Sequence, residues 1–238
     1  MPVKRPDNTR TSRRQRRGGF TLSELMIALG ILAYGLTMSA SLFTTAMKFS
    51  NASFRDVVGT IMCENGVALI RARLTEGDLG GVPVDTLTDI SNKFDDHDLL
   101  YPTGDTDSLY GLKVLAKRVS SGENDFQFVI LAYKKNRKGN NVDLRKLSGK
   151  IANHGDEQSK FTSGSIPGGL LPDSPFVRGN GAISYVDGIS GNTVILRDRM
   201  EMTGTMDVDA FVLVESGSDI ANPTGLAAFA VRMGVPVK

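Results

Sequence analysis

The chain has 238 residues, a formal net charge of +2 and one cysteine. Seven of its 28 basic residues but only one of its 26 acidic residues lie in residues 1–19, so the rest of the chain carries a net charge of −4. A single cysteine excludes an intramolecular disulfide, and the length after the N-terminal segment allows one modest globular domain.

Residues 1–19 contain six arginines and one lysine and show no apolar periodicity, which predicts a disordered segment. An arginine cluster can be an arm that binds nucleic acid. Here the cluster precedes a long apolar run, so the positive-inside rule gives a simpler account. The arginines hold the N-terminus in the cytoplasm, and the bulk of the chain crosses the membrane. The sequence therefore indicates no nucleic-acid partner.

The apolar run from Leu25 to Met47 has no charged residue. As a helix rising about 1.5 Å per residue, a run of this length can cross the roughly 30 Å hydrocarbon core of a bilayer. Gly30 and Gly35 lie in the run, and small residues allow neighbouring membrane helices to approach closely, although they are also ordinary in membrane helices. The run predicts a membrane span.

The residues before the run are Gly19, Phe20 and, after Thr-Leu-Ser, Glu24. This segment resembles the N-terminus of type IV pilins and of type II secretion pseudopilins. The resemblance implies that a prepilin peptidase cuts after Gly19, that Phe20 becomes the methylated N-terminus, and that Glu24 is the acidic fifth residue of the mature chain. An ordinary secretory signal is cut after its apolar region, whereas here the span is retained.

A carboxylate in an apolar span is costly and needs a partner. A free amine created at Phe20 of one subunit could pair with Glu24 of its neighbour, and Coulomb attraction at low dielectric would then favour one axial stagger. Alternatively, Glu24 simply lies at the depth of the lipid headgroups. The two interpretations are compatible.

Beyond Lys48 the helical pattern becomes amphipathic. Its apolar residues are Phe54, Val57, Val58, Ile61, Met62, Ala68, Leu69 and Ala72. We predict one helix from Phe20 to about Leu74, whose second half packs this stripe on a globular domain before Gly77, Gly80, Gly81 and Pro83 end it. The predicted segments are a cleaved leader (1–19), a membrane or filament-core helix (20–48), its amphipathic continuation (49–78) and an exported β-rich domain (79–238).

Residues 82–108 are polar and predict a loop with a short helix near Leu87. Short runs rich in β-branched and aromatic residues then predict strands. They are 112–119, 126–133, 182–186, 193–197, 210–215 and 226–233. Residues 120–125 and 190–192 predict hairpin connections, and residues 134–180 an excursion over the sheet. The fold class is α+β, a long N-terminal helix on an antiparallel β-sheet, which is also the pilin-like arrangement that the resemblance implies.

The sequence contains few patterns typical of catalysis or of cofactor and metal binding. His97 and His154 have no metal-ligand spacing, and we find no phosphate-binding loop, dinucleotide motif or hydrolase elbow, so we predict no enzyme, no catalytic residue and no organic cofactor. Cys63 is predicted to be a buried small apolar residue. One acidic cluster, Asp95, Asp96, Asp98, Asp105 and Asp107, is a calcium candidate, as in some pseudopilins, or a solvated loop.

These patterns predict a structural subunit, a pseudopilin or minor pilin, of a type II secretion or type IV pilus-like filament. Its partners would be prepilin peptidase, other pilin or pseudopilin subunits, an inner-membrane assembly platform and membrane lipid. It would cross the bacterial inner membrane once, with a cytoplasmic N-terminus and a periplasmic or extracellular domain. The alternative is a membrane-anchored binding or adhesion protein.

Overall fold

The computed structural model describes residues 20–101, 108–120, 124–137, 140–154, 158–199, 204–216 and 224–237, apart from the side chains of Asp96 and His154. The chain divides into two units, residues 1–51 and 52–238, and each is considered by itself.

The long helix α1 spans Leu22–Arg73, which confirms the predicted continuous helix to within two residues at each end. By length and composition, α1 is the one helix among the described residues that could cross a membrane. In the first unit its side chains are exposed throughout. Hydroxyl groups within the span bond back to helix carbonyl oxygens, as Thr37 does to Tyr34 (2.8 Å) and Ser41 to Met38 (2.8 Å). Such bonds satisfy polar groups that lipid cannot.

In the second unit α1 ends at Arg73, before the predicted stop at the glycines. Asp78 accepts hydrogen bonds from the backbone N–H (2.9 Å) and hydroxyl (2.7 Å) of Thr75, and this starts the 3₁₀ helix η1, Glu76–Leu79. The predicted helix near Leu87 is wrong in position, because Leu87 is buried outside any helix. The short helices η2 (Ser91–Lys93) and α2 (Asp96–Leu99) follow instead.

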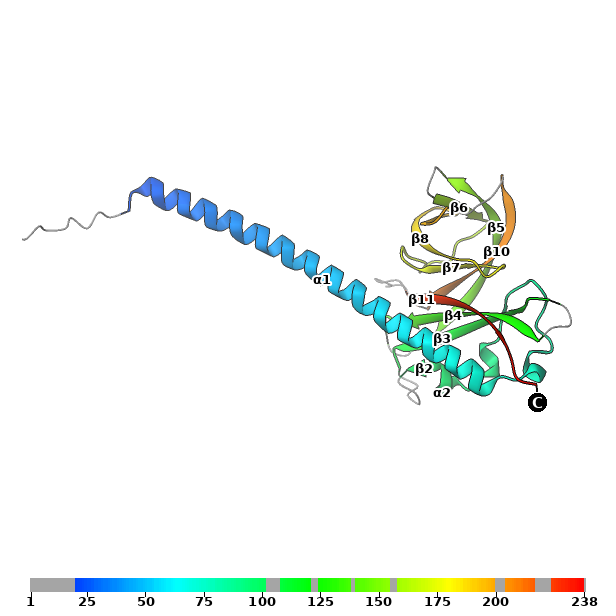
Figure 1. Ribbon diagram of the computed structural model, residues 1–238. Coiled ribbons are helices and arrows are strands. Elements are labelled where there is room, and N and C mark those ends of the chain that lie inside the picture. Colours follow the sequence, from blue (N-terminus) through cyan, green and yellow to red (C-terminus); the bar gives the residue numbers. More distant parts are fainter. Residues whose placement is uncertain are drawn as a thin grey trace, which may run out of the picture. The chain divides into compact units, whose positions relative to one another are not determined.

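Five strands form the first sheet, in the order β1-β3-β4-β11 with β2 paired to β3. They are β1 (Thr88–Asp89), β2 (Leu100–Tyr101), β3 (Tyr110–Arg118), β4 (Asp125–Lys134) and β11 (Gly225–Gly234). Strands β3, β4 and β11 lie side by side in it (Figure 1). Every pair is antiparallel. This confirms three predicted strands. The connection predicted between β3 and β4 falls partly on residues 121–123, outside the described residues.

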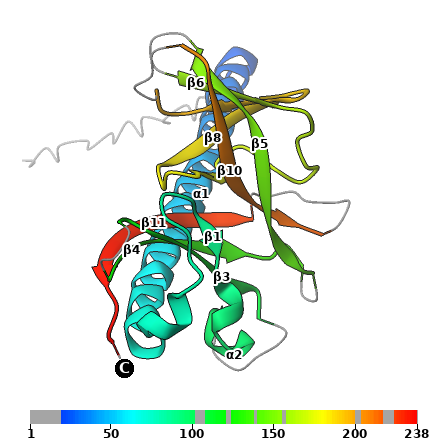
Figure 2. The same cartoon turned by 90° about the vertical axis from the view of Figure 1, so that its right-hand side faces the viewer.

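Six further strands close into an antiparallel barrel in the order β10-β5-β6-β9-β8-β7. They are β5 (Val142–His154), β6 (Gln158–Ser163), β7 (Pro175–Arg178), β8 (Ile183–Ser190), β9 (Thr193–Leu196) and β10 (Met206–Glu215). The long strands β5 and β10 run side by side (Figure 2). The expectation that 134–180 is an excursion without strands is therefore wrong, because this segment supplies β5, β6 and β7.

There is a physical reason why the sequence pattern does not predict β5. Only one of its faces packs into the barrel, through Leu147 and Ile151, so its remaining positions are mostly polar. Gly149 lies between these two residues and resembles a break, yet a Cβ atom there would lie 2.3 Å from the Thr162 carbonyl oxygen. Glycine is needed in this strand because the neighbouring strand approaches closely.

The central strand β4 is buried on both faces. Phe126, Phe128 and Ile130 pack in a cluster with Met62, Cys63 and Ile70 of α1. The alternate residues Val129, Leu131 and Tyr133 pack with outward-facing residues of the barrel, among them Val177 of β7 and Phe211 of β10. The second unit is thus layered, with the C-terminal part of α1, the sheet and the barrel in that order.

The face that α1 turns to the sheet differs from the predicted stripe. Its buried residues are Gly59, Met62, Cys63, Gly66 and Ile70. Phe54, Val57, Ile61, Ala68 and Ala72, which the periodicity assigned to the packed stripe, are instead exposed, so only part of that prediction holds. The glycine face packs on the sheet because it lets the helix backbone approach β11 closely. A Cβ atom at Gly59 would lie 2.7 Å from Ala227 Cβ.

A buried carboxylate ties the sheet to the barrel. Glu215, at the end of β10, is 2% exposed and accepts hydrogen bonds from the connection between β4 and β5. Its donors include the backbone N–H of Asn136 (2.8 Å), that of Arg137 (3.2 Å) and the side-chain amide of Asn140 (2.7 Å). Thr224, just before β11, adds a hydroxyl at 3.4 Å. Glu215 therefore hydrogen-bonds both to the segment that leads from the sheet into the barrel and to the segment that leads back to the sheet.

We predict that Gly59→Ala destabilises the protein although alanine favours helix. The added methyl group meets the β11 backbone and Cβ atoms, which cannot swing away, and overpacking of this kind costs about 1–3 kcal/mol against a propensity gain of about 1 kcal/mol. Thermal unfolding of the full-length protein in detergent measures the change. Gly81→Ala is the matched control, because nothing lies within 4 Å of a Cβ there. A melting temperature of Gly59→Ala at or above that of the wild type contradicts the prediction.

A second prediction concerns pH. Burial opposes the charge of Glu215, but the donors from Asn136, Arg137 and Asn140 outweigh it and hold the Glu215 pKa below its ordinary value. The carboxylate therefore stabilises the fold above the unfolded-state pKa, near 4.5, and this contribution is lost as the pH falls through the lower folded-state pKa. Glu215→Gln should cost about 2 kcal/mol at pH 7. The difference in melting temperature from wild type should shrink between pH 7 and pH 3, and a constant difference contradicts it.

Candidate functional site

The segment before α1 forms a reciprocal cap. The backbone N–H and the hydroxyl of Thr21 each donate to Glu24 Oε2 at 2.9 Å, and the backbone N–H of Glu24 lies 3.3 Å from the Thr21 hydroxyl oxygen. This is the capping-box arrangement, with threonine preceding the helix and glutamate in its first turn. The cap is absent from the sequence-based predictions, although its signal, threonine followed three residues later by glutamate, is visible in the chain.

The cap changes what Glu24 does in its own chain. The first turn of a helix has backbone N–H groups without partners and carries a partial positive charge, which a carboxylate stabilises. One oxygen of Glu24 serves this purpose. Its Oε1 accepts no hydrogen bond from any residue that the structure describes, so part of the carboxylate stays open to another donor.

The predicted processing junction, between Gly19 and Phe20, lies at the start of the described residues. Phe20 is 88% exposed and precedes the helix. Gly19 lies outside the described residues, as does the whole predicted leader. The roles predicted for Gly19, Phe20 and Glu24 in processing and assembly stay predictions.

The acidic cluster is only partly described. Asp95 is exposed, and Asp98 forms an ion pair with Arg73 of α1 at 3.3 Å. Asp105, Asp107 and the side chain of Asp96 lie outside the described residues. Within the described ranges, no group of three or more histidine, cysteine, aspartate or glutamate residues could hold a metal ion. Calcium binding by this loop also stays a prediction.

Cys63 is 2% exposed on the face of α1 that packs against β4, which confirms the prediction of a buried residue. Burial raises the pKa of its thiol to about 11. Since the thiolate is the nucleophile, this thiol is unreactive at neutral pH.

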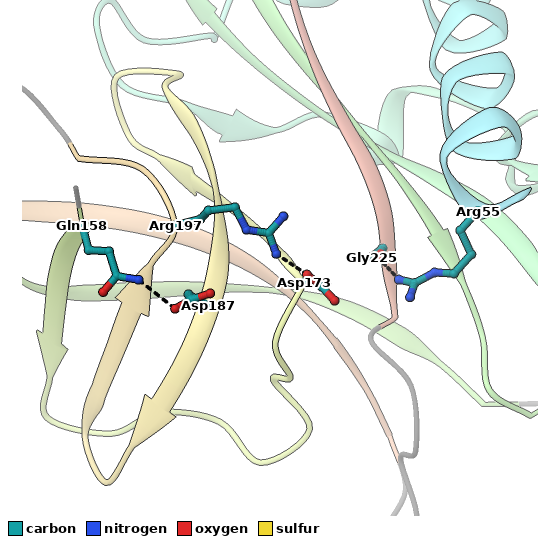
Figure 3. Close-up of polar contacts among 6 residues, drawn as sticks. All are labelled: Arg55, Gln158, Asp173, Asp187, Arg197 and Gly225. Carbon is teal, nitrogen blue, oxygen red and sulfur yellow. Dashed lines mark hydrogen bonds and ion pairs between the residues drawn. The ribbon is translucent and has the colours of Figure 1, made fainter. Parts of the chain in front are cut away.

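A polar cleft of about 480 Å³ lies among α1, β11 and the barrel in the second unit. In it Arg197 pairs with Asp173, and Arg55 donates to the Gly225 carbonyl oxygen at 3.3 Å (Figure 3). Arg197 also lies over the ring of Tyr185, 6.0 Å from its centre. Burial raises the pKa of Tyr185, which keeps its phenol neutral.

The groups in this cleft bond mainly to one another. Among its described lining residues are the hydroxyl groups of Thr60 and Tyr185, but no histidine, cysteine or serine. Arg55 instead caps a carbonyl oxygen at the start of the edge strand β11. The polar groups of the cleft therefore mainly connect α1, β11 and the barrel to one another.

Residues 14–40 match the sequence model of the prokaryotic N-terminal methylation motif. This motif is the prepilin-type cleavage and methylation segment of type IV pilins and pseudopilins. It covers the predicted cleavage junction, Thr21, Glu24 and the first part of the apolar span. Comparison with curated proteins and with solved structures found no match.

Proposed function

We propose that this protein is a pseudopilin or minor pilin, a structural subunit of a type II secretion or type IV pilus-like filament. The observation that carries the proposal is the methylation motif at residues 14–40, placed at the start of a helix with a charge-free span. Prepilin peptidase cuts after Gly19, and the new amine at Phe20 is methylated. The subunit is held in the inner membrane by the span until an assembly platform moves it into the filament.

The layered second unit supports this role. The C-terminal part of α1 is fixed to the sheet by the cluster around Ile70 and Ile130, so the exported unit is attached to the same helix that carries the span. Without a disulfide, this packing and the Glu215 bonds hold the exported unit together. The role of the protein is then structural. Its helix α1 connects the exported unit to the span that enters the filament, and the protein catalyses no reaction.

Glu24 has two roles in this proposal. Oε2 caps α1, and Oε1, which is open in the single chain, accepts the amine of Phe20 from a neighbouring subunit. A charge pair in a water-poor filament core is strong, and breaking it by removing one partner leaves the other charge unpaired.

We predict that the mature chain begins at Phe20 and that Phe20 is methylated. Gly19→Val should block cutting, because the proposed cut follows directly after Gly19. Gly18→Val, one residue earlier, is the matched control and should be cut normally. Intact-mass measurement of protein from its native membrane decides the matter. Wild-type protein that keeps residues 1–19 would refute the proposed processing.

A series at the cap separates the two roles of Glu24. Glu24→Gln retains a side chain able to accept the Thr21 N–H but loses the charge, whereas Thr21→Ala keeps the charge and loses the hydroxyl. If the charge drives assembly, Glu24→Gln and Glu24→Leu should be cleaved normally yet lower the filament-to-membrane ratio about tenfold, equivalent to about 1.4 kcal/mol. Thr21→Ala should assemble within about twofold of wild type.

The readout is quantitative blotting of sheared filaments and membranes from cells that carry the assembly machinery. Equal incorporation of Glu24→Gln and wild type contradicts the charge role and leaves Glu24 as a helix cap. If wild-type protein is cleaved but absent from sheared filaments, the membrane-anchored binding protein becomes the better description.

A further inference from the structure

An exposed line of residues runs along α1 in the second unit, on the side opposite the sheet. At 3.6 residues per turn its members lie on one side of the helix, while Gly59, Cys63 and Gly66 face the sheet. The line, called here the outer line, comprises Phe54, Val57, Ile61, Glu64, Ala68 and Arg71. Its three large apolar side chains, Phe54, Val57 and Ile61, are 61%, 58% and 48% exposed, respectively.

The outer line consists of two columns whose residues are spaced seven apart. Phe54, Ile61 and Ala68 form one column. Val57, Glu64 and Arg71 form the other. Residues seven apart return to nearly the same side of the helix, with a drift of about 20°, so the first column is an apolar strip and the second presents Val57 followed by two charges. Charges that flank an apolar strip are the groups that pair between neighbouring helices and set their alignment.

The two charges in the second column fix how such a seam can align. Glu64 and Arg71 are exposed, and neither forms an ion pair within the part of the chain that the structure describes. They cannot pair with each other, because seven residues separate them by about 10.5 Å along the helix. Two parallel copies in register would set Glu64 against Glu64 and Arg71 against Arg71. A shift of seven residues sets Glu64 of one copy against Arg71 of the next.

We infer that the outer line is the contact between neighbouring copies of this chain, packed parallel with an axial stagger of about 10.5 Å and joined by a Glu64–Arg71 ion pair between copies. The inference rests on the proposed function, because the parallel orientation follows from copies that all enter the membrane the same way. The same stagger places Phe54 of one copy beside Ile61 of the next, so apolar side chains meet as well.

This contact is open-ended. Each copy offers its Glu64 to one neighbour and its Arg71 to another, so the two halves of the contact use different residues. Contacts of that kind do not close into a dimer and can continue along a filament. A second copy is the occupant that the charges favour, since the outer line is complementary to itself only after the shift.

Charge reversal with rescue tests the pair. Glu64→Arg and Arg71→Glu each set like charges together at every contact and should lower the filament-to-membrane ratio about tenfold. The double variant restores an opposite pair with reversed polarity and should return to within about twofold of wild type. Lys160→Glu is the matched control, since it reverses an exposed charge on the barrel and should assemble normally.

The outcomes separate this inference from the proposed function. If wild type is absent from sheared filaments, the proposed function fails and the inference falls with it. If wild type assembles and the single reversals also assemble normally, the pair is wrong while the filament role stands. Loss in the singles without rescue in the double also overturns the pair, because it indicates damage to the subunit rather than a broken contact.

Cross-linking tests the stagger directly. When Ile61→Cys and differently tagged Ala68→Cys chains are co-expressed, oxidation should link the two kinds of chain, because the shift brings these positions together. Phe54→Cys with Ala68→Cys should link far less, since it requires a shift of two repeats. The native Cys63 is buried and does not compete. Equal yields from both combinations, or none in assembled filaments, overturn the proposed stagger.

Discussion

The fold depends on the burial of β4 from both sides. Its run of aromatic and aliphatic residues leaves no face for water, so each face needs its own cover. On one side the cover is α1, which reaches the sheet closely because glycines replace side chains at the contact. On the other side it is the outside of the barrel, where β7 and β10 turn alternate residues inward and outward. Removing either cover would expose an apolar face of the sheet, so the folded sheet needs both α1 and the barrel.

The sequence predicts those parts of the fold whose apolar pattern is complete. The helix α1 follows from a long charge-free run and an amphipathic continuation. Strands β3, β4 and β11 of the sheet and β8, β9 and β10 of the barrel follow from apolar runs. Strand β5 escapes prediction because along most of its length only the side chains that point into the barrel, such as Leu147 and Ile151, are apolar, and because Gly149 resembles a break. Residues near Leu87 escape it because burial there comes from distant strands rather than from local periodicity.

The candidate site likewise has features that the sequence predicts and features that it does not. The methylation motif lies in consecutive residues, so Phe20 and Glu24 can be singled out from the amino-acid sequence alone, and the matched motif covers both. The Thr21 cap has an equally local signal, but a carboxylate beside an apolar span points first to a partner charge and only second to a helix start. The direction in which the second half of α1 faces could not be predicted. Its period fits either side, and only the glycine contacts with β11 and Ile130 select one.

The barrel is inserted between two strands that pair with each other. Strand β4 ends at Lys134 and its neighbour β11 begins at Gly225, so the sheet cannot be completed until the whole barrel segment has been synthesised. Closing so long a loop in a free chain carries an entropic cost, and contacts distant in sequence slow folding. The barrel brings the two ends of this loop together. Once β5 and β10 have paired, Glu215 holds the departing and returning chain within one hydrogen-bond network, and β11 starts its search already beside β4. In the folded chain, the pairing of β5 with β10 therefore brings together the two ends of an insertion that would otherwise separate β4 from β11.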